Sequence, residues 1–280
     1  MTYKELLKAG EIKAQENKME KTAIKSLLLF ASGKTPTELY ISLENEAKEE
    51  ETDKFFQAVE SYTINKKPVA YIIGYTYFYG YKMKVTDQVL IPRWETEELV
   101  SNILIYYDDL FKGQTVDAVD LGTGSGAIAI ALKKEEEKIN MIATDISLQA
   151  LEVAKENASL NSADITFYEG SWLEPIKDKK FDIIVSNPPY LTNTEFVEDI
   201  VKDNEPHVAL YGGKDGLDFY EEILKEAVPL VKDRFFIAFE NSYNKKRQLN
   251  NIIKKYFPDC LIINLKDSAK RNRMTFIIKK

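Results

Sequence analysis

The stretch Asp117-Ala118-Val119-Asp120-Leu121-Gly122-Thr123-Gly124-Ser125-Gly126 decides the fold of this chain. The residues from Val116 to Leu121 predict a strand, and the glycines that follow predict a tight turn. Ala127 to Leu132 predict the start of a helix. Glycines let the backbone approach a ligand closely, and the first turn of a helix offers free N–H groups. The stretch therefore predicts a strand, a ligand-binding turn and a helix in succession.

Strands and helices alternate beyond this stretch. The predicted strands are residues 116–121, 140–144, 165–168, 183–186, 235–239, 261–265 and 274–278, and the predicted helices are residues 127–132, 148–160, 217–231 and 245–256. This alternation predicts an α/β fold with a doubly wound, mostly parallel sheet of seven strands. No helix separates the last two strands, which predicts a hairpin that makes the last strand antiparallel.

A different pattern precedes this alternation. Apolar residues within 1–67 recur at helical spacing and predict a small helical bundle. Over residues 68–93, aromatic and β-branched residues are interrupted by Gly74 and Gly80, which predicts a β-hairpin linker. We therefore expect three parts, of which the third is the sheet domain of residues 94–280.

The composition is that of a folded globular protein. With 280 residues and 44% hydrophobic content, the chain is long enough for one large core and one smaller core. No stretch approaches the roughly 18 apolar residues of a membrane helix, and residues 1–5 lack the apolar region of a signal peptide, so we expect a cytoplasmic protein. The formal charge of -7 is unfavourable for holding nucleic acid without sequence preference, although residues 270–273 leave a local basic patch open.

Cysteine and histidine are too scarce for several kinds of site. Cys260 and His207 are the only residues of their types, which excludes an internal disulfide and argues against zinc sites and against Ser-His-Asp or Cys-His hydrolases. Cys260 begins an apolar run, so we expect it in the core. His207 follows Pro206 in a predicted loop, where we expect no direct catalytic role. We expect no metal site.

An acidic residue stands where the next predicted strand ends. Asp145 follows Gly126 by 19 positions, and there it can accept hydrogen bonds from both hydroxyls of a ribose. The glycine turn and Asp145 together predict an adenosine-type cofactor. With Ala127 the same residues also match the pattern Gly-x-Gly-x-x-Ala, so a nicotinamide-dependent oxidoreductase and a tight turn without a ligand both stay open.

A second stretch, Phe181-Asp182-Ile183-Ile184-Val185-Ser186-Asn187-Pro188-Pro189-Tyr190, carries the chemistry. Its first half predicts a buried strand, which the two prolines end in a rigid turn. The Asn187 amide oxygen, the Pro188 carbonyl and the Tyr190 ring suit a planar NH2 group, because they offer two acceptors and an aromatic face. An ordinary Asx-Pro turn would also fit these residues. A hydride-transfer enzyme has no need of this arrangement, whereas an amine or amide methyltransferase does.

The residues from Asp120 to Gly126, Asp145 and the turn from Asn187 to Tyr190 resemble the class I methyltransferases that use S-adenosylmethionine. Within that class the chain is similar, over nearly its whole length, to the protein-glutamine methyltransferases that act on class I peptide-chain release factors. Further stretches carry the resemblance, namely residues 68–74, 91–97, 205–210, 212–217 and 266–267. The resemblance implies an N-terminal helical domain that recognises the substrate, ahead of the catalytic sheet.

The resemblance also implies a role for each motif residue. The methionine and ribose part of S-adenosylmethionine would lie against Gly122, Thr123, Gly124, Ser125 and Gly126. Asp145 would hold the ribose, and Trp172 would pack near the adenine, unless core packing alone explains Trp172. The catalytic turn would be Asn187, Pro188, Pro189 and Tyr190, with Asn187 also contacting the cofactor. The products would be S-adenosylhomocysteine and a release factor with a methylated glutamine. We expect a monomer with no membrane partner and no direct nucleic acid partner.

Two positions depart from the pattern of that family. Trp94 stands where a second proline is usual, and we expect this to alter the loop over the methionine end of the cofactor. Asn241-Ser242 follow Glu240 where Ile-Gly is usual. We expect the second departure to change the backbone after the strand, because Ser242 resists dihedrals that glycine permits.

Three other functions stay open on the sequence. A glutamine methyltransferase of a ribosomal protein would have nearly the same sheet domain. An adenine-specific DNA methyltransferase faces the same NH2 geometry, but it needs a basic DNA-binding surface. A non-enzymatic module that binds a release factor or the ribosome rests on the departures at Trp94 and Asn241-Ser242.

Overall fold

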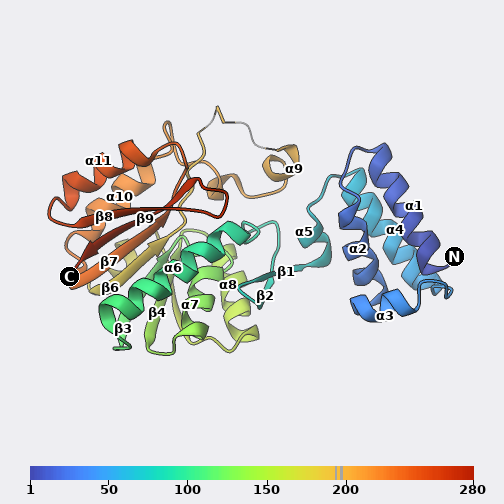
Figure 1. The fold of residues 1–280 in the computed structure, drawn as a ribbon, viewed down its shortest axis with the longest axis horizontal. Coiled ribbons are helices and arrows are strands. Elements are labelled where there is room, and N and C mark those ends of the chain that lie inside the picture. Colours follow the sequence, from blue (N-terminus) through green and yellow to red (C-terminus); the bar gives the residue numbers. More distant parts are fainter. Residues whose placement is uncertain (193, 196–197) are drawn as a thin grey trace. The chain divides into compact units, whose positions relative to one another are not determined.

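The computed structural model describes residues 1–192, 194–195 and 198–280 (Figure 1). These residues form two compact units. The first comprises residues 1–75 and 198–204, and the second comprises residues 76–192, 194–195 and 205–280. Among the helices within these ranges, none has the length and apolar character needed to cross a membrane.

The first unit is a bundle of helices. They are α1 (Tyr3–Glu16), α2 (Thr22–Ser32), α3 (Pro36–Ile41), α4 (Glu49–Thr63), α5 (Val69–Ile73) and α9 (Asp199–Lys202). Thr2 and Thr35 begin α1 and α3 with capping boxes, in which the threonine hydroxyl accepts a backbone N–H from a glutamate whose carboxylate bonds back. A Cβ on Gly10 would lie 2.6 Å from Ile24 and 2.8 Å from Phe55. The missing side chain therefore lets α1 pack closely against α2 and α4.

A two-stranded hairpin follows the last of the N-terminal helices. β1 (Tyr75–Phe78) pairs with β2 (Tyr81–Lys84). The two loop residues, Tyr79 and Gly80, have φ values of +52° and +81°. Positive φ at both loop positions is the geometry of a type I′ turn, whose twist matches that of paired strands.

The segment expected as a hairpin over residues 68–93 begins with a helix. α5 follows Pro68 and ends at Gly74, whose φ is +86°. Glycine ends helices in this way because no Cβ obstructs the left-handed conformation. The aromatic and β-branched residues that predicted the hairpin form strands only from Tyr75 onward.

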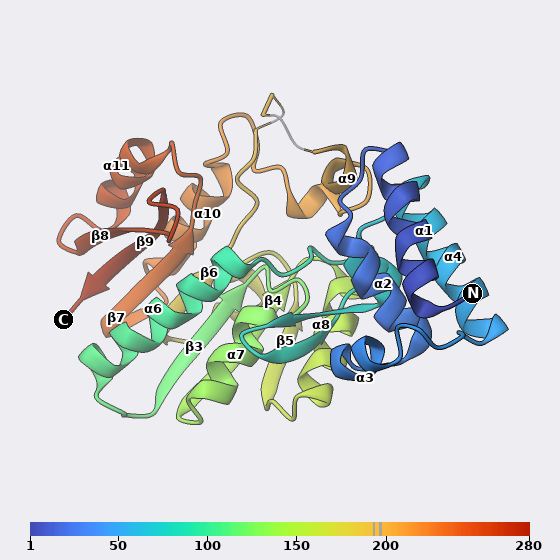
Figure 2. The same cartoon turned by 45° about the vertical axis from the view of Figure 1, so that its right-hand side comes forward.

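The second unit is built on a seven-stranded sheet with the order β5-β4-β3-β6-β7-β9-β8 (Figure 2). Its strands are β3 (Val116–Leu121), β4 (Ile139–Asp145), β5 (Ile165–Glu169), β6 (Phe181–Ser186), β7 (Val231–Glu240), β8 (Leu261–Lys266) and β9 (Asn272–Lys279). β3 to β7 pair in parallel, and β9 is antiparallel to both of its neighbours, β7 and β8. The predicted doubly wound sheet with an antiparallel last strand is confirmed.

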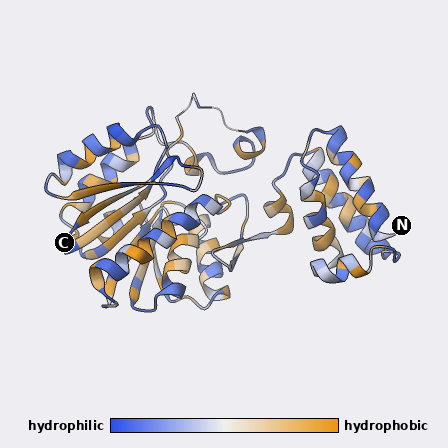
Figure 3. Ribbon diagram, in the orientation of Figure 1, coloured by the Kyte–Doolittle hydropathy of each residue, from blue (hydrophilic) through white to orange (hydrophobic). Residues whose placement is uncertain are grey.

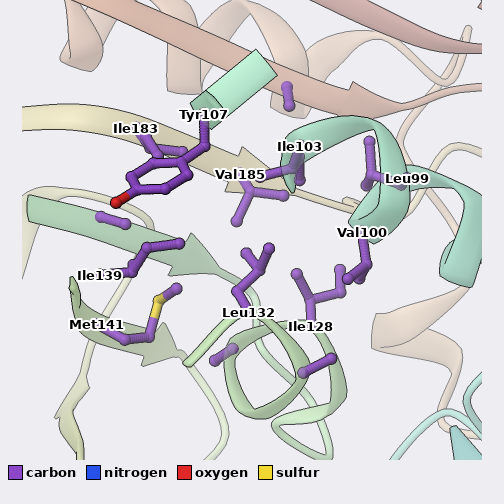
Figure 4. Close-up of a cluster of buried hydrophobic side chains, with 14 of the residues drawn as sticks. Leu99, Val100, Ile103, Tyr107, Ile128, Leu132, Ile139, Met141, Ile183 and Val185 are labelled. Atoms are coloured by element: carbon purple, nitrogen blue, oxygen red, sulfur yellow. The ribbon is translucent and has the colours of Figure 1, made fainter. Parts of the chain in front are cut away.

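Helices cover both faces of this sheet. They are α6 (Trp94–Phe111), α7 (Ala127–Glu135), α8 (Leu148–Leu160), α10 (Asp218–Ala227) and α11 (Lys246–Tyr256), with short 3-10 helices η1 (Glu174–Ile176) and η2 (His207–Ala209). On one face, Leu99 of α6 and Ile128 of α7 belong to the cluster that also holds Val185 of β6 (Figure 4). On the other face, Ile223 of α10 and Leu249 of α11 belong to a second cluster.

The central strands are buried on both faces. In β3, Ala118 joins the first cluster and Val119 the second, and in β6 Ile183 and Ile184 alternate in the same way. Figure 3 accordingly colours most of the sheet as hydrophobic. Because β3 and β6 are parallel neighbours, the turns that follow them lie at the same edge of the sheet.

Lys232 of β7 forms ion pairs at the opposite end of the strands, where β3 and β6 begin. The Nζ of Lys232 lies 2.6 Å from Oδ2 of Asp117 and 2.6 Å from Oδ2 of Asp182, near the amino ends of β3 and β6. The sequence predicted a helix that ends at residue 231 and a strand over residues 235–239, so β7 begins four residues earlier than predicted. The strand extends there because two carboxylates receive the lysine charge.

Candidate active site

A cavity of about 220 Å³ opens at the carboxyl ends of the parallel strands. Its lining includes the turn after β3, the end of β4, the residues after β5 and the turn after β6. The lining residues predicted from the sequence are Gly122, Thr123, Gly124, Ser125, Asp145, Trp172, Asn187 and Pro189. Gly126, Pro188 and Tyr190 were predicted as site residues as well, but they do not line this cavity.

The glycine turn has the backbone geometry that its sequence predicted. Gly122, Gly124 and Gly126 have φ values of +67°, +55° and +82°. A Cβ on Gly126 would lie 3.2 Å from the Cβ of Ala154, so this glycine lets the start of α7 approach α8. The backbone N–H groups of Gly122 and Thr123 both donate to the Thr144 carbonyl at 2.9 Å, which fixes the turn to β4.

The carboxylate of Asp145 is held beside this turn. Its Oδ2 accepts the Gly124 N–H at 2.8 Å, and its Oδ1 accepts the Ser147 N–H at 2.9 Å. Burial raises the pKa of Asp145, and these backbone N–H groups act in the opposite direction. Asp145 is therefore held in a fixed position at the end of β4, where the sequence placed it.

Trp172 lies in the wall of the cavity and not only in the core. Its indole Nε1 donates to Oε2 of Glu222 at 3.1 Å, and its ring centroid lies 5.3 Å from that of Phe219. Its φ of +41° is uncommon for a bulky residue. The Thr144 hydroxyl, which donates to the Trp172 carbonyl at 2.8 Å, helps to hold this conformation.

Asp120, the acidic residue within the glycine stretch, is buried. Its Oδ2 accepts the hydroxyl hydrogen of Thr123 at 2.6 Å. Burial raises its pKa from 3.8 to about 7, because the charged form is poorly solvated there. Asp120 therefore changes charge near neutral pH, directly beneath the turn.

Replacing Asp120 with asparagine is expected to stabilise the protein at neutral pH. The folded protein keeps a proton on Asp120 that the unfolded chain has already released, so the free energy of unfolding falls as the pH rises from about 4 to about 7. Asparagine removes this penalty and can still accept the Thr123 hydrogen. The advantage of Asp120→Asn over the native protein should reach about 2–4 kcal/mol at about pH 8 and vanish near about pH 4.

Denaturant unfolding at the two pH values measures this difference, with Asp117→Asn as the control. Burial raises the pKa of Asp117, but its hydrogen bonds with Lys232 and Asn140 outweigh burial and lower the pKa overall. Asp117→Asn should therefore lose stability at neutral pH, opposite in sign to Asp120→Asn. An equal advantage of Asp120→Asn at both pH values would contradict the role of burial.

The turn after β6 brings Asn187 to the cavity. Its Nδ2 donates to the Thr96 hydroxyl oxygen at 3.4 Å, and both residues line the cavity. Pro188 is buried. The Tyr190 hydroxyl donates to Oε1 of Glu240 at 3.3 Å, so a carboxylate at the end of β7 anchors the last residue of the turn.

Glu240 is the centre of a buried polar cluster behind this turn. The Thr96 hydroxyl donates to its Oε2 at 2.7 Å, and Nη1 of Arg273 donates to the Tyr190 hydroxyl at 3.3 Å. Burial raises the pKa of Glu240, while the Thr96 hydrogen bond and the Arg273 charge act against that rise. Sequence reasoning assigned no role in the site to Thr96, Glu240 or Arg273, although Thr96 lies in the stretch of residues 91–97 that carries the family resemblance.

Two glycines lie in close contact with the backbone of the turn after β6. A Cβ on Gly212 would lie 2.2 Å from the Pro189 carbonyl oxygen, and one on Gly216 would lie 2.2 Å from the Tyr190 carbonyl oxygen. The Gly212 N–H also donates to the Leu191 carbonyl at 2.9 Å. Sequence reasoning noted residues 212–217 only through the family resemblance. The structure explains Gly212 and Gly216, because a side chain at either position would collide with the backbone of the turn.

The loop before α6 is tied to Glu205. Arg93 and Glu205 form an ion pair with a 2.5 Å N–O distance, and the Ile91 N–H donates to the same carboxylate at 3.2 Å. Trp94, the first departure from the family pattern, is 57% exposed at the start of α6. The anchoring contacts are therefore made by the residues before Trp94.

The second departure is accommodated by side-chain hydrogen bonds. Ser242 does not adopt a positive φ, so the backbone there needs no glycine. Asn241 is buried, and its Oδ1 accepts the Thr275 hydroxyl hydrogen at 2.8 Å. Its N–H donates to the Arg273 carbonyl at 2.8 Å. The change in backbone geometry expected at Ser242 stays a prediction, and these hydrogen bonds show how the polar pair fits the end of β7.

Comparison with known proteins identifies the family. Residues 5–74 match the PrmC N-terminal domain, and residues 100–212 match the Methyltransferase small domain. Over 277 residues the chain is 39% identical to the release factor glutamine methyltransferase of Bacillus subtilis, covering 97% of this chain and 96% of that protein. The chain belongs to the release factor glutamine methyltransferase family. The family member from Bacillus cereus is 34% identical over 280 residues, covering 99% of each chain.

A solved methyltransferase structure has the same fold as this chain. The T. thermophilus 16S rRNA N2 G1207 methyltransferase, in complex with AdoMet and guanosine, superposes with a TM-score of 0.53 at 15% identity. The match covers 74% of this chain and 50% of that chain. The resemblance stated from the motifs is confirmed, and with it the enzyme class, a methyltransferase of the release factor glutamine methyltransferase family.

Proposed function

We propose that the chain transfers a methyl group from S-adenosylmethionine to the side-chain amide nitrogen of a glutamine in class I release factors. The observation that carries this proposal is the position of Asn187, whose amide lines one cavity together with the glycine turn and Asp145. The names of the family members in two Bacillus species support the choice of substrate.

The residues around the cavity fit an adenosine cofactor with a charged methionine tail. A Cβ on Gly122 would lie 3.2 Å from the Trp172 ring, so a side chain at this position would crowd the wall of the cavity. The Asp145 carboxylate would accept the ribose hydroxyls, Trp172 would pack near the adenine, and residues 122–126 would face the methionine part. When bound, the cofactor supplies an electrophilic methyl group on a sulfonium.

The catalytic turn would act by positioning. A glutamine amide nitrogen is a poor nucleophile, because its lone pair is delocalised into the carbonyl. The Asn187 side-chain oxygen and the Pro188 carbonyl would accept both N–H hydrogens, which raises electron density on the nitrogen and points it at the methyl group. The Tyr190 ring would stack on the amide plane, held by its hydroxyl at Glu240. The nitrogen can lose its proton after transfer, without a strong base.

Labelled methyl transfer tests the proposed function. The pure protein is incubated with S-adenosylmethionine labelled in its methyl group, in parallel with class I release factors, ribosomal proteins and DNA. We expect the label on one glutamine of a release factor, located by peptide mass spectrometry. Label on a ribosomal protein or on adenine, or no label on any of the three, would overturn the assignment.

Replacing Asp145 with alanine is expected to weaken the binding of S-adenosylmethionine. Two hydrogen bonds from ribose to a carboxylate are lost, so the dissociation constant should rise by about 10- to 100-fold. Isothermal titration calorimetry measures it. Asp164→Ala is the matched control, because Asp164 is exposed and precedes β5. Equal affinities of the two variants would refute the role of Asp145, provided that thermal unfolding shows both to be folded.

A further inference from the structure

We propose that Thr96, held by Glu240, fixes which end of the Asn187 amide faces the cavity, and that this orientation makes the site accept a carboxamide and reject a carboxylate. The inference rests on the proposed function, because it concerns how the same turn selects its substrate. Thr96 and Glu240 are therefore positioning residues that act through Asn187.

The direction of the hydrogen bonds in the buried cluster follows from Arg273. A guanidinium can only donate, so the Tyr190 hydroxyl accepts from Arg273 and turns its own hydrogen toward Oε1 of Glu240. In its ionised form, which the Arg273 charge favours, the Glu240 carboxylate can only accept, so Oε2 takes the hydrogen of Thr96 at 2.7 Å. Each member of this chain has one orientation that satisfies its neighbours.

The hydroxyl of Thr96 has only one hydrogen, and Glu240 takes it. Toward Asn187 the hydroxyl oxygen can therefore only accept. The Asn187 amide must turn its NH2 group to Thr96, where Nδ2 lies 3.4 Å from the hydroxyl oxygen. The two ends of an asparagine amide have nearly the same shape, so this hydrogen bond, and not packing, decides which end is which.

The fixed orientation leaves the Asn187 oxygen for the substrate. An acceptor there suits the N–H of a glutamine and repels the oxygens of a glutamate, because two acceptors face one another without a hydrogen between them. Substrate binding strengthens the effect, since the polar groups of a rejected substrate lose contact with water and stay unpaired in the site. The cluster therefore favours a glutamine side chain over a glutamate side chain at the position that faces the Asn187 oxygen.

The cluster is protected from water and from competing partners. Thr96 and Glu240 are 5% and 3% exposed. The Tyr220 hydroxyl donates to the Glu240 backbone carbonyl at 2.8 Å, which fixes the end of β7 independently of the side chain. Arg273 is held from its other side by Asp267, whose Oδ2 lies 3.5 Å from the Arg273 Nε. Within the part of the chain that the structure describes, the orientation of the Asn187 amide therefore depends on the Thr96 hydroxyl.

Thr96→Val and Thr96→Ser test this inference as a matched pair. Valine keeps the shape of threonine and removes the hydroxyl, whereas serine keeps the hydroxyl. The substrate is an intact class I release factor, and the competitor is the same factor with its methyl-accepting glutamine replaced by glutamate. Two quantities are measured for each enzyme: kcat with the glutamine form, and the inhibition constant of the glutamate form divided by the KM of the glutamine form.

For Thr96→Val we expect kcat to fall by about 10- to 100-fold and the glutamate-to-glutamine ratio to fall by about tenfold, because the Asn187 amide can turn either way. Thr96→Ser should retain both quantities within about threefold. A loss of kcat with an unchanged ratio would mean a merely structural role and would overturn the inference, as would a fully active Thr96→Val. If the native protein fails to methylate the release factor at all, the proposed function fails instead. S-adenosylmethionine binding and thermal unfolding confirm that each variant is folded.

Discussion

Replacing Asn187 with alanine is expected to abolish methyl transfer and to leave cofactor binding largely intact. The variant loses the side-chain acceptor for one amide hydrogen, so the nitrogen is neither activated nor aimed at the methyl group. Loss of one well-placed polar group in an active site typically costs about 100- to 1,000-fold in kcat. Single-turnover transfer of labelled methyl to a release factor measures the loss, and calorimetry measures cofactor affinity.

Asn161→Ala serves as the control for this substitution. The Asn161 Nδ2 donates to the Lys82 carbonyl at 2.9 Å, and this residue is not among those that line the cavity. It should keep full transfer activity. Substantial turnover by Asn187→Ala would show that another group accepts the amide hydrogen, and the assignment of Asn187 would then be wrong.

Replacing Gly212 with alanine is expected to cause the second largest loss. The new Cβ would lie 2.2 Å from the Pro189 carbonyl oxygen and 2.9 Å from the Tyr190 Cα, and neither backbone atom can swing away as a side chain would. The turn of residues 187–190 must therefore move. A displacement of about 1 Å can cost about 100-fold in rate, and overpacking typically costs about 1–3 kcal/mol in stability.

Gly113→Ala separates this contact from backbone strain. Gly113 has a φ of +73°, and a Cβ there meets only the Lys138 side chain at the ordinary distance of 3.7 Å. It should lose some stability through strain and keep transfer activity. We expect Gly212→Ala to lose transfer at a temperature where thermal unfolding shows it folded. Equal activities of the two variants would mean that the turn tolerates the contact.

The fold was predictable because its signals are local. The predicted strand at residues 116–121 and the predicted helix at 148–160 match the structure to the residue. A buried parallel strand and an amphipathic helix can each be recognised from the apolar pattern of a short stretch of sequence. The antiparallel pairing of the last two strands was predictable as well, but their positions in the sheet were not. β9 lies inside and β8 at the edge, which depends on packing that no local pattern records.

The candidate site was predictable only in part, because some of its contacts join distant parts of the chain. Asp145 ends a strand, and the glycine turn and Asn187 directly follow strands, so sequence reasoning can place all three. The bond between Thr96 and Glu240 spans 144 positions, and a threonine near a helix start reads as an ordinary first-turn residue. Likewise, Gly212 has an ordinary backbone, and only its contact with Pro189 explains it.

β9 lies between β7 and β8 in the sheet although it follows both of them in the sequence. It pairs with Phe235–Glu240 of β7, and its Arg273 donates to the Tyr190 hydroxyl. A ribosome adds about 5–20 residues per second from the N-terminus, so the turns after β3 and β6 leave it before the strand that completes the sheet. Until residues 272–279 emerge, the edge of β7 is unpaired and Tyr190 lacks its guanidinium partner. We therefore expect the chain to gain methyl transfer activity only after β9 has been inserted.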